Sequence, residues 1–301
     1  MNSPVKTFSL LVVTLCIATL ALAAEPVAFR AEVSGSGRPM ILIPGLACPG
    51  SVWSSTVSHF ENRYEMHVLT LGGFAGQPAV GGPFVSTMTD AIARYIRTHE
   101  LDHPVIVGHS IGGLIAYSVA SKYPDLVGPV IAVDGVPFLP ALQNPAATPE
   151  AAAPFADGIR QTYENLSAEE FAKRNRAALS SMITDPAEVD AVAGPSAKSD
   201  RATVAEAVYE AMTTDLRDEV AKIRQPVLLI AAVPADVPEE LREPLVAAYG
   251  AEIANIPDHR LVVAKTRHFV MLDAPKFFFR TVESFLDGPA GTPVRGSGDG
   301  R

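Results

Sequence analysis

Cysteine is scarce in this sequence, and so is clustered positive charge. Only two of the 301 residues are cysteine, and Cys16 lies in an apolar N-terminal segment, which leaves Cys48 alone in the rest of the chain. We therefore expect no internal disulfide, so packing must stabilise the fold. Lysine and arginine total 24 against 33 acidic residues, and no run of basic residues occurs. This balance argues against nucleic acid and anionic membranes as partners and favours a small neutral or cationic ligand.

The two ends of the chain differ from the part between them. A lysine, an apolar run over residues 8–22 and small residues after it are typical of a secretory signal peptide over residues 1–23. The run is short for a membrane span, so we expect a cleaved signal, a periplasmic or secreted protein, and no stable membrane insertion. Residues 288–301 are rich in glycine and proline without an apolar face, which predicts a disordered tail.

Short apolar runs alternate with helical patterns along the rest of the chain. Near-continuous hydrophobic runs are typical of parallel strands that helices cover on both faces. They predict an α/β fold with a mostly parallel, doubly wound sheet, built from residues 25–138 and 215–287. The six runs cover residues 40–45, 66–71, 104–110, 129–135, 226–232 and 260–265, and an edge strand precedes them within residues 28–39.

A long insertion separates the fourth of these runs from the fifth. It is far longer than a connection between neighbouring parallel strands needs. Helix-start signals occur at Pro149, at Ser167 with Glu170 three residues later, and at Asp185 before a proline. They predict a helical cap of about four helices over residues 139–214, above the carboxyl edge of the sheet.

One run leads directly into the motif Gly108-His109-Ser110-Ile111-Gly112, and a helix is expected from Leu114 to Lys122. A serine at such a strand-to-helix corner sits on a strained turn that pushes its hydroxyl out of the sheet, and the flanking glycines avoid collisions there. Gly-x-Ser-x-Gly alone is a weak signal, because serine and glycine are ordinary turn residues. In this context it predicts a nucleophile at Ser110.

A serine nucleophile needs a base and an oxyanion hole. His268 follows the last apolar run, at the carboxyl edge of the predicted sheet, whereas His109 points away from the position of the Ser110 hydroxyl. We therefore assign His268 as the base. The backbone N–H groups of Ile111 and Leu46 are the expected oxyanion donors. Cys48, near Leu46, is interpreted as a packing residue.

These segments resemble the α/β-hydrolase superfamily over about residues 27–287. The resemblance rests on IPGLACPGSVW (43–53), GHSIGG (108–113), TRHFVMLDAPKFF (266–278) and the insertion between the strands. It implies the α/β-hydrolase fold with a helical cap, and the roles of nucleophile and base for Ser110 and His268. Pro44 stands where the family commonly has histidine, which alters the loop but leaves its N–H donor in place.

Two aspartates are candidates for the acid of the triad, because the segment AAVPADVPEE lacks the glycine that the family usually has before its catalytic aspartate. Asp236 lies in this proline-rich segment, one residue later than usual. Asp134 ends a strand at a second position where members of the superfamily carry the acid. Both keep the chain order of serine, acid and histidine. We favour Asp134 and retain Asp236 as the alternative.

The sequence thus predicts an exported serine hydrolase that cleaves a carboxylic ester or lactone through an acyl-enzyme. It requires no cofactor, and no histidine and carboxylate spacing suggests a metal site. Cofactor-free carbon–carbon hydrolases, perhydrolases and acyltransferases use the same triad, and a non-catalytic ligand-binding protein is the alternative from another class. Neither the natural substrate nor the oligomeric state follows from the sequence. Possible lining residues of the cap, which are equally candidates for its core, are Phe155, Phe171, Met182 and Met212.

Overall fold

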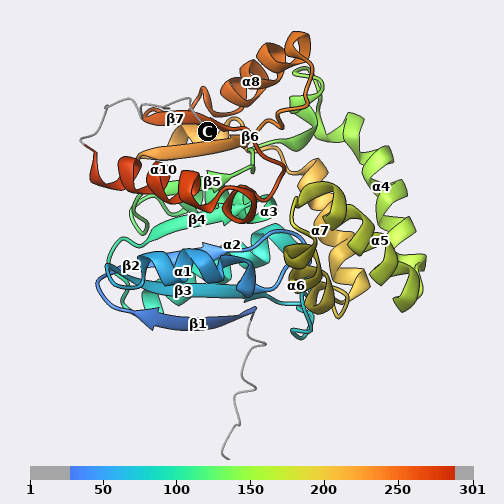
Figure 1. Cartoon of the computed structure of the whole chain (residues 1–301), viewed down its shortest axis with the longest axis horizontal. Coiled ribbons are helices and arrows are strands. Elements are labelled where there is room, and N and C mark those ends of the chain that lie inside the picture. The colour runs from blue at the N-terminus through green and yellow to red at the C-terminus, as the bar shows by residue number, and fades with distance from the viewer. Residues whose placement is uncertain (1–27, 289–301) are drawn as a thin grey trace, which may run out of the picture.

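The structure, a computed structural model, describes residues 28–288. The predicted signal peptide and all but the first residue of the predicted tail lie outside the described residues. Within them a seven-stranded sheet runs in the order β1-β3-β2-β4-β5-β6-β7, and only β1 is antiparallel to its neighbour (Figure 1). The strands are β1 (Phe29–Gly35), β2 (Arg38–Ile43), β3 (Tyr64–Leu71), β4 (Val105–His109), β5 (Val130–Val133), β6 (Val227–Ala232) and β7 (His259–Ala264). The predicted mostly parallel α/β fold is confirmed.

Helices cover both faces of the sheet, which explains the continuous apolar runs. Every residue of β4, β5 and β6 is buried. Ile41 belongs to the core on one face and Met40 to the core on the other, because successive side chains of a strand point in opposite directions. The first face carries α2 (Phe84–Thr98), α3 (Ile111–Lys122) and α8 (Glu239–Ile253), and the second carries α1 (Ser54–Phe60) and α10 (Pro275–Asp287) (Figure 1). The connections contain the short helices η1 (Gly50–Trp53), η3 (Glu219–Lys222) and α9 (Val270–Asp273).

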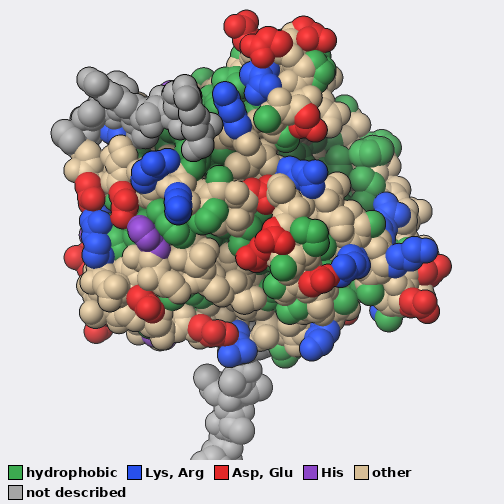
Figure 2. All heavy atoms as spheres, viewed as in Figure 1, with side chains coloured by type: hydrophobic (Ala, Val, Ile, Leu, Met, Phe, Trp, Pro, Cys, Tyr) green, Lys and Arg blue, Asp and Glu red, His purple; other side chains and the backbone are tan. Residues whose placement is uncertain are grey.

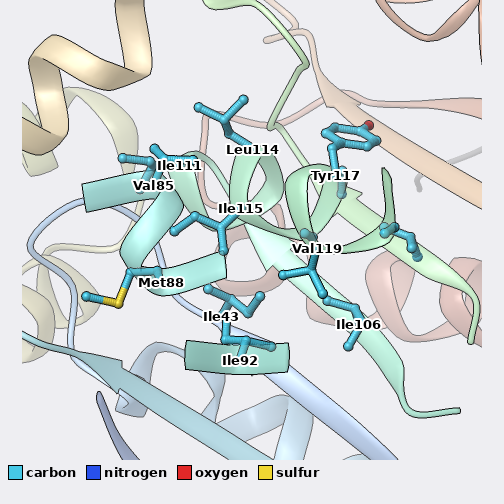
Figure 3. Close-up of a cluster of buried hydrophobic side chains, with 14 of the residues drawn as sticks. Ile43, Val85, Met88, Ile92, Ile106, Ile111, Leu114, Ile115, Tyr117 and Val119 are labelled. Atoms are coloured by element: carbon cyan, nitrogen blue, oxygen red, sulfur yellow. The ribbon is translucent and has the colours of Figure 1, made fainter. Parts of the chain in front are cut away.

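The core under α2 and α3 is mostly aliphatic and supports the turn that carries Ser110. Figure 3 shows Ile92 of α2 beside Ile43 of the sheet, and Val119 of α3 beside Ile106. The helix α3 begins at Ile111, three residues before the expected start. The prediction was late because glycine disfavours helix in isolation, whereas here a side chain at Gly112 would lie 2.4 Å from the Ile43 carbonyl oxygen.

Four α-helices lie between β5 and β6 and gather beside one end of the sheet (Figure 1). Side chains cap their N-termini: Thr148 accepts a hydrogen bond at the start of α4, Ser167 and Glu170 form a reciprocal capping box, and Asp185 and Asp200 cap the next two helices. The elements of this cap are η2 (Leu139–Leu142), α4 (Pro149–Asn165), α5 (Ala168–Met182), α6 (Pro186–Ser196) and α7 (Arg201–Thr213).

The buried carboxylate of Glu210 fastens the cap to the core. Glu210, on α7, accepts hydrogen bonds from the backbone N–H groups of Phe84 and Val85, the first two residues of α2. These N–H groups have no partner within their own helix, so the carboxylate satisfies them and complements the positive end of the helix dipole.

The surface shows no large region of one charge in the view of Figure 2, where acidic and basic side chains are interspersed. No helix within residues 28–288 is long and apolar enough to span a membrane.

Candidate active site

The turn between β4 and α3 places Ser110 at the carboxyl edge of the sheet. Ser110 has φ 56° and ψ −122°, a backbone conformation that residues other than glycine rarely adopt. Its N–H donates to the Val133 carbonyl oxygen at 2.9 Å. A Cβ at Gly108 would lie 2.1 Å from the Gly112 carbonyl oxygen, so only glycine fits there. The local strain is maintained by the buried strand and helix on its two sides.

Asp134 and His268 form a hydrogen-bonded pair beside Ser110. The His268 Nδ1–H donates to Asp134 Oδ2 at 2.5 Å, and the Asp134 side chain is only 9% exposed. A carboxylate on Nδ1 leaves Nε2 of the neutral imidazole without a proton, which is the tautomer that can accept one. Because Ser110, Asp134 and His268 follow the parallel strands β4, β5 and β7, their side chains meet at one edge of the sheet.

The second oxygen of Asp134 is held by two donors. The backbone N–H of Ala232 donates to Oδ1 at 2.9 Å, and the Tyr249 hydroxyl donates to the same atom at 2.7 Å. Asp134 itself has φ 47°, so this environment holds a strained residue in place. With His268, three hydrogen bonds satisfy the carboxylate, and its orientation is determined from three sides.

Tyr249 was not found from the sequence. It lies on α8, 115 residues from Asp134, and no motif in its neighbourhood points to it. Burial and the adjacent Asp134 carboxylate raise the pKa of Tyr249 well above its usual range. The hydroxyl therefore remains protonated and keeps donating to Asp134.

His109 is completely buried behind His268 at the carboxyl edge of the sheet. Its Nε2–H donates to the backbone carbonyl oxygen of His268 at 3.1 Å, and the centres of the two rings are 4.5 Å apart. Burial, with a smaller contribution from His268, holds the pKa of His109 well below its ordinary value. A neutral His109 thus anchors the loop that carries His268.

Leu46 and Ile111 line the same cavity as Ser110. Leu46 lies in the turn after β2, which a hydrogen bond of 3.1 Å from the Cys48 N–H to the Gly45 carbonyl oxygen closes. Within residues 28–288, neither the Leu46 N–H nor the Ile111 N–H has a hydrogen-bond acceptor. Both groups are available to a ligand.

The alternative acid lies elsewhere. Asp236 is in an exposed turn after β6, and among the described residues no hydrogen bond or ion pair joins it to His268. Cys48 is buried, and burial raises its pKa to about 12, which suppresses the thiolate. No group of three or more potential metal-ligating side chains occurs within residues 28–288.

A cavity of about 290 Å³ opens above the pair, and most of its wall is aliphatic. Of the four suggested cap residues only Met212 reaches it. Phe171 and Met182 take the alternative role considered for them, because Phe171 is buried in the core on one face of the sheet and Met182 packs against the core on the other. Phe155 does neither, since it is 66% exposed. The cavity is lined by Leu46, Ser110, Ile111, Leu114, Asp134, Gly135, Val136, Leu139, Leu142, Val208, Ala211, Met212, Tyr249 and His268.

A larger groove of about 810 Å³ lies along β1 and α2. It contains neither Ser110 nor His268. We therefore place the candidate site at the smaller cavity, because convergent polar groups mark a site better than volume does.

Comparison with known proteins agrees with this fold. The chain is 21% identical over 275 residues to a pimeloyl-[acyl-carrier protein] methyl ester esterase of Vibrio vulnificus (strain YJ016). This alignment covers 84% of the present chain and 96% of the relative. The enol-lactonase of Burkholderia xenovorans LB400 superposes with a TM-score of 0.69 at 18% identity, over 86% of this chain and 96% of that one. A thermophilic esterase of Thermogutta terrifontis gives a TM-score of 0.65 at 21% identity, over 86% and 93%.

The model of one family matches residues 40–281, which run from β2 through the cap and into α10 and leave out only β1 of the seven strands. The matched range includes Ser110, both candidate acids and His268. The predicted resemblance is confirmed, and the chain belongs to the alpha/beta hydrolase family.

Proposed function

We propose that this protein is a serine hydrolase that cleaves a carboxylic ester or lactone through an acyl-enzyme on Ser110. The observation that carries the proposal is the hydrogen bond between His268 and Asp134 at a cavity that Ser110 also lines. A nucleophile, a base and an orienting acid that share one cavity are the groups that acyl transfer requires.

In the proposed reaction the Ser110 hydroxyl oxygen attacks the substrate carbonyl carbon while His268 Nε2 takes the hydroxyl proton. Asp134 stabilises the imidazolium ion that results. The tetrahedral intermediate collapses, the alkoxide leaves with the proton from His268, and the acyl group remains on Ser110. Water then attacks the acyl-enzyme in the same way, releases the acid and restores the serine.

The developing negative charge on the carbonyl oxygen needs preorganised donors. Leu46 and Ile111 line the cavity, and their N–H groups have no acceptor within the described residues, which supports their assignment as the oxyanion hole. A serine at the corner also disfavours the alkyl-enzyme chemistry of relatives that have aspartate there.

Ester and lactone hydrolases are frequent among the similar proteins, which supports ester or lactone cleavage. The similar proteins include pimeloyl-[acyl-carrier protein] methyl ester esterases and, among solved structures, an enol-lactonase and a protein described as an N-acyl homoserine lactone degrading enzyme. We assign this chain the bond type that they share and not their individual substrates.

Rapid mixing of the protein with a chromogenic acyl ester tests the proposal. We expect a burst of alcohol release equal to the concentration of protein, followed by slower turnover. In Ser110→Ala both phases should disappear, with a loss in kcat of about 10⁴ to 10⁶, while circular dichroism remains unchanged. Ser121→Ala, a serine of α3 far from the corner in sequence, is the matched control. A burst that survives in Ser110→Ala would refute the assignment.

We also propose that the protein is exported, because residues 1–23 carry the features of a signal peptide. N-terminal sequencing of the protein from a fractionated host is the test. A chain that keeps Met1 in the cytoplasm would contradict export without affecting the proposed chemistry.

A further inference from the structure

We propose that the cavity at Ser110 takes a compact, uncharged aliphatic ester or lactone and discriminates against substrates whose acyl chain bears a carboxylate. This inference rests on the proposed function and specifies the substrate class of the same site. It comes from the lining of the cavity, from its size and from the charges around it.

The cavity offers a ligand almost no polar partner besides the reacting groups. Its one other polar side chain, Tyr249, already donates its hydroxyl hydrogen to Asp134. No lysine or arginine of the described chain lines it. The wall opposite the sheet consists of aliphatic and thioether side chains, namely Leu139 and Leu142 of η2 and Val208, Ala211 and Met212 of α7.

A carboxylate in this cavity would lose its hydration without gaining a counterion. The transfer of an unpaired charge into an apolar environment is among the most costly changes in a protein. The Asp134 carboxylate, which also lines the cavity, would repel it, and the net charge of −9 opposes the approach of anions.

Arg217, just after the last cap helix, already has partners within the protein. Arg217 binds the Asp215 carboxylate and donates to the carbonyl oxygens of Pro145 and Ala147, and its guanidinium lies 4.8 Å from the centre of the Phe138 ring. It lines no part of the cavity. Its charge joins the segment after α7 to the segment before α4 and is not free to pair with a substrate.

The volume limits the size of the bound group. About 290 Å³ is near the lower end of ordinary small-molecule sites. Leu139 lines the cavity and is 47% exposed, so the cavity reaches solvent beside η2. A short aliphatic acyl chain or a small lactone ring fits this space, with the opening left for the alcohol.

The test compares ethyl hexanoate with monoethyl adipate, in which a carboxylate replaces the terminal methyl group. We expect kcat/KM of the full-length protein to favour ethyl hexanoate by at least about 100-fold. Met212→Lys places an ammonium group on the cavity wall and should reduce this preference by about tenfold or more. Ala202→Lys adds the same charge to an exposed position of the same helix and should leave the preference unchanged.

A binding measurement separates this inference from the proposed chemistry. In Ser110→Ala, which cannot form the acyl-enzyme, ethyl hexanoate should raise the melting temperature and monoethyl adipate should not. If Ser110-dependent turnover occurs but monoethyl adipate is cleaved as fast as ethyl hexanoate, the substrate class is wrong and the hydrolase stands. If Ser110→Ala shows the selective shift but the native protein cleaves neither ester, the hydrolase is wrong and the ligand class stands. A shift with the anionic ester, or with neither ester, overturns the inference.

Discussion

Asp134 and His268 are 134 residues apart in the sequence, and their side chains meet in a hydrogen bond of 2.5 Å. Asp134 follows β5, which lies beside the strand β4 that leads to Ser110, whereas His268 follows β7 at the far edge of the sheet. The pair spans β5 to β7 because the carboxyl ends of parallel strands lie at one edge. Asp236, which follows β6 between them, remains in solvent.

Substitution of the two aspartates by asparagine should give opposite results. In Asp134→Asn the side chain no longer supplies the charge that holds the productive imidazole tautomer, so kcat should fall by about 10³ to 10⁴. Asp236→Asn should remain close to wild type, because Asp236 is exposed and does not touch His268. Steady-state kinetics with circular dichroism compares them. An inactive Asp236→Asn beside an active Asp134→Asn would reverse the assignment.

Tyr249→Phe removes one donor from Asp134 and keeps the ring in the cavity wall. We expect kcat to fall about tenfold, because a hydrogen bond to a charged group contributes about 1.5–3 kcal/mol and part of this loss affects the orientation of His268. KM should change little. The control is Tyr163→Phe on the cap helix α4, outside the cavity. A change in KM alone would mean that Tyr249 only shapes the cavity.

Glu252 should make the stability of the protein depend on pH. Burial is the main cause that raises its pKa from 4.5 to about 7, while its carboxylate accepts a hydrogen bond from the Phe138 N–H at 2.7 Å. The folded state therefore holds a proton that the unfolded state releases. The contribution of Glu252 to stability is complete below about pH 4.5 and is lost as the pH rises through about 7.

Glu252→Gln keeps an acceptor for Phe138 and cannot titrate. Relative to wild type, its free energy of unfolding should increase by about 1–3 kcal/mol between pH 4.5 and pH 8. Urea unfolding at both pH values measures this difference. The control is Glu240→Gln, exposed on the same helix, for which the difference should stay constant. A constant difference for Glu252→Gln as well would show that Glu252 does not bind the proton.

Glu210→Ala should loosen the cap. It leaves the N–H groups of Phe84 and Val85 without their carboxylate, and a lost helix cap costs about 0.5–2 kcal/mol. Because Glu210 lies on the helix that carries Val208 and Met212, KM should also rise. Thermal unfolding and steady-state kinetics measure the two effects. Glu164→Ala, exposed on α4, is the control, and equal melting temperatures for the two variants would rule out the tether.

The sequence by itself was sufficient where the pattern is local. Runs buried on both faces identified the parallel strands, because periodicity and length are properties of short segments. Ser110 could be singled out because a strand, two glycines and a helix adjoin it, and the Ser167 capping box needs only residues three positions apart. His268 was placed by its position after the last strand and by family resemblance.

The tertiary structure decided what depends on residues far apart in the chain. Asp134 and Asp236 both keep the chain order of serine, acid and histidine, so the order cannot distinguish them. Only the tertiary structure does, because it places Ala232, Tyr249 and His268 around Asp134. The lining of the cap was likewise undetermined, because an apolar residue at helical spacing serves a cavity wall or a core equally well. Which side chain faces the cavity depends on how helices pack against the sheet, and that information resides in no single segment of the sequence.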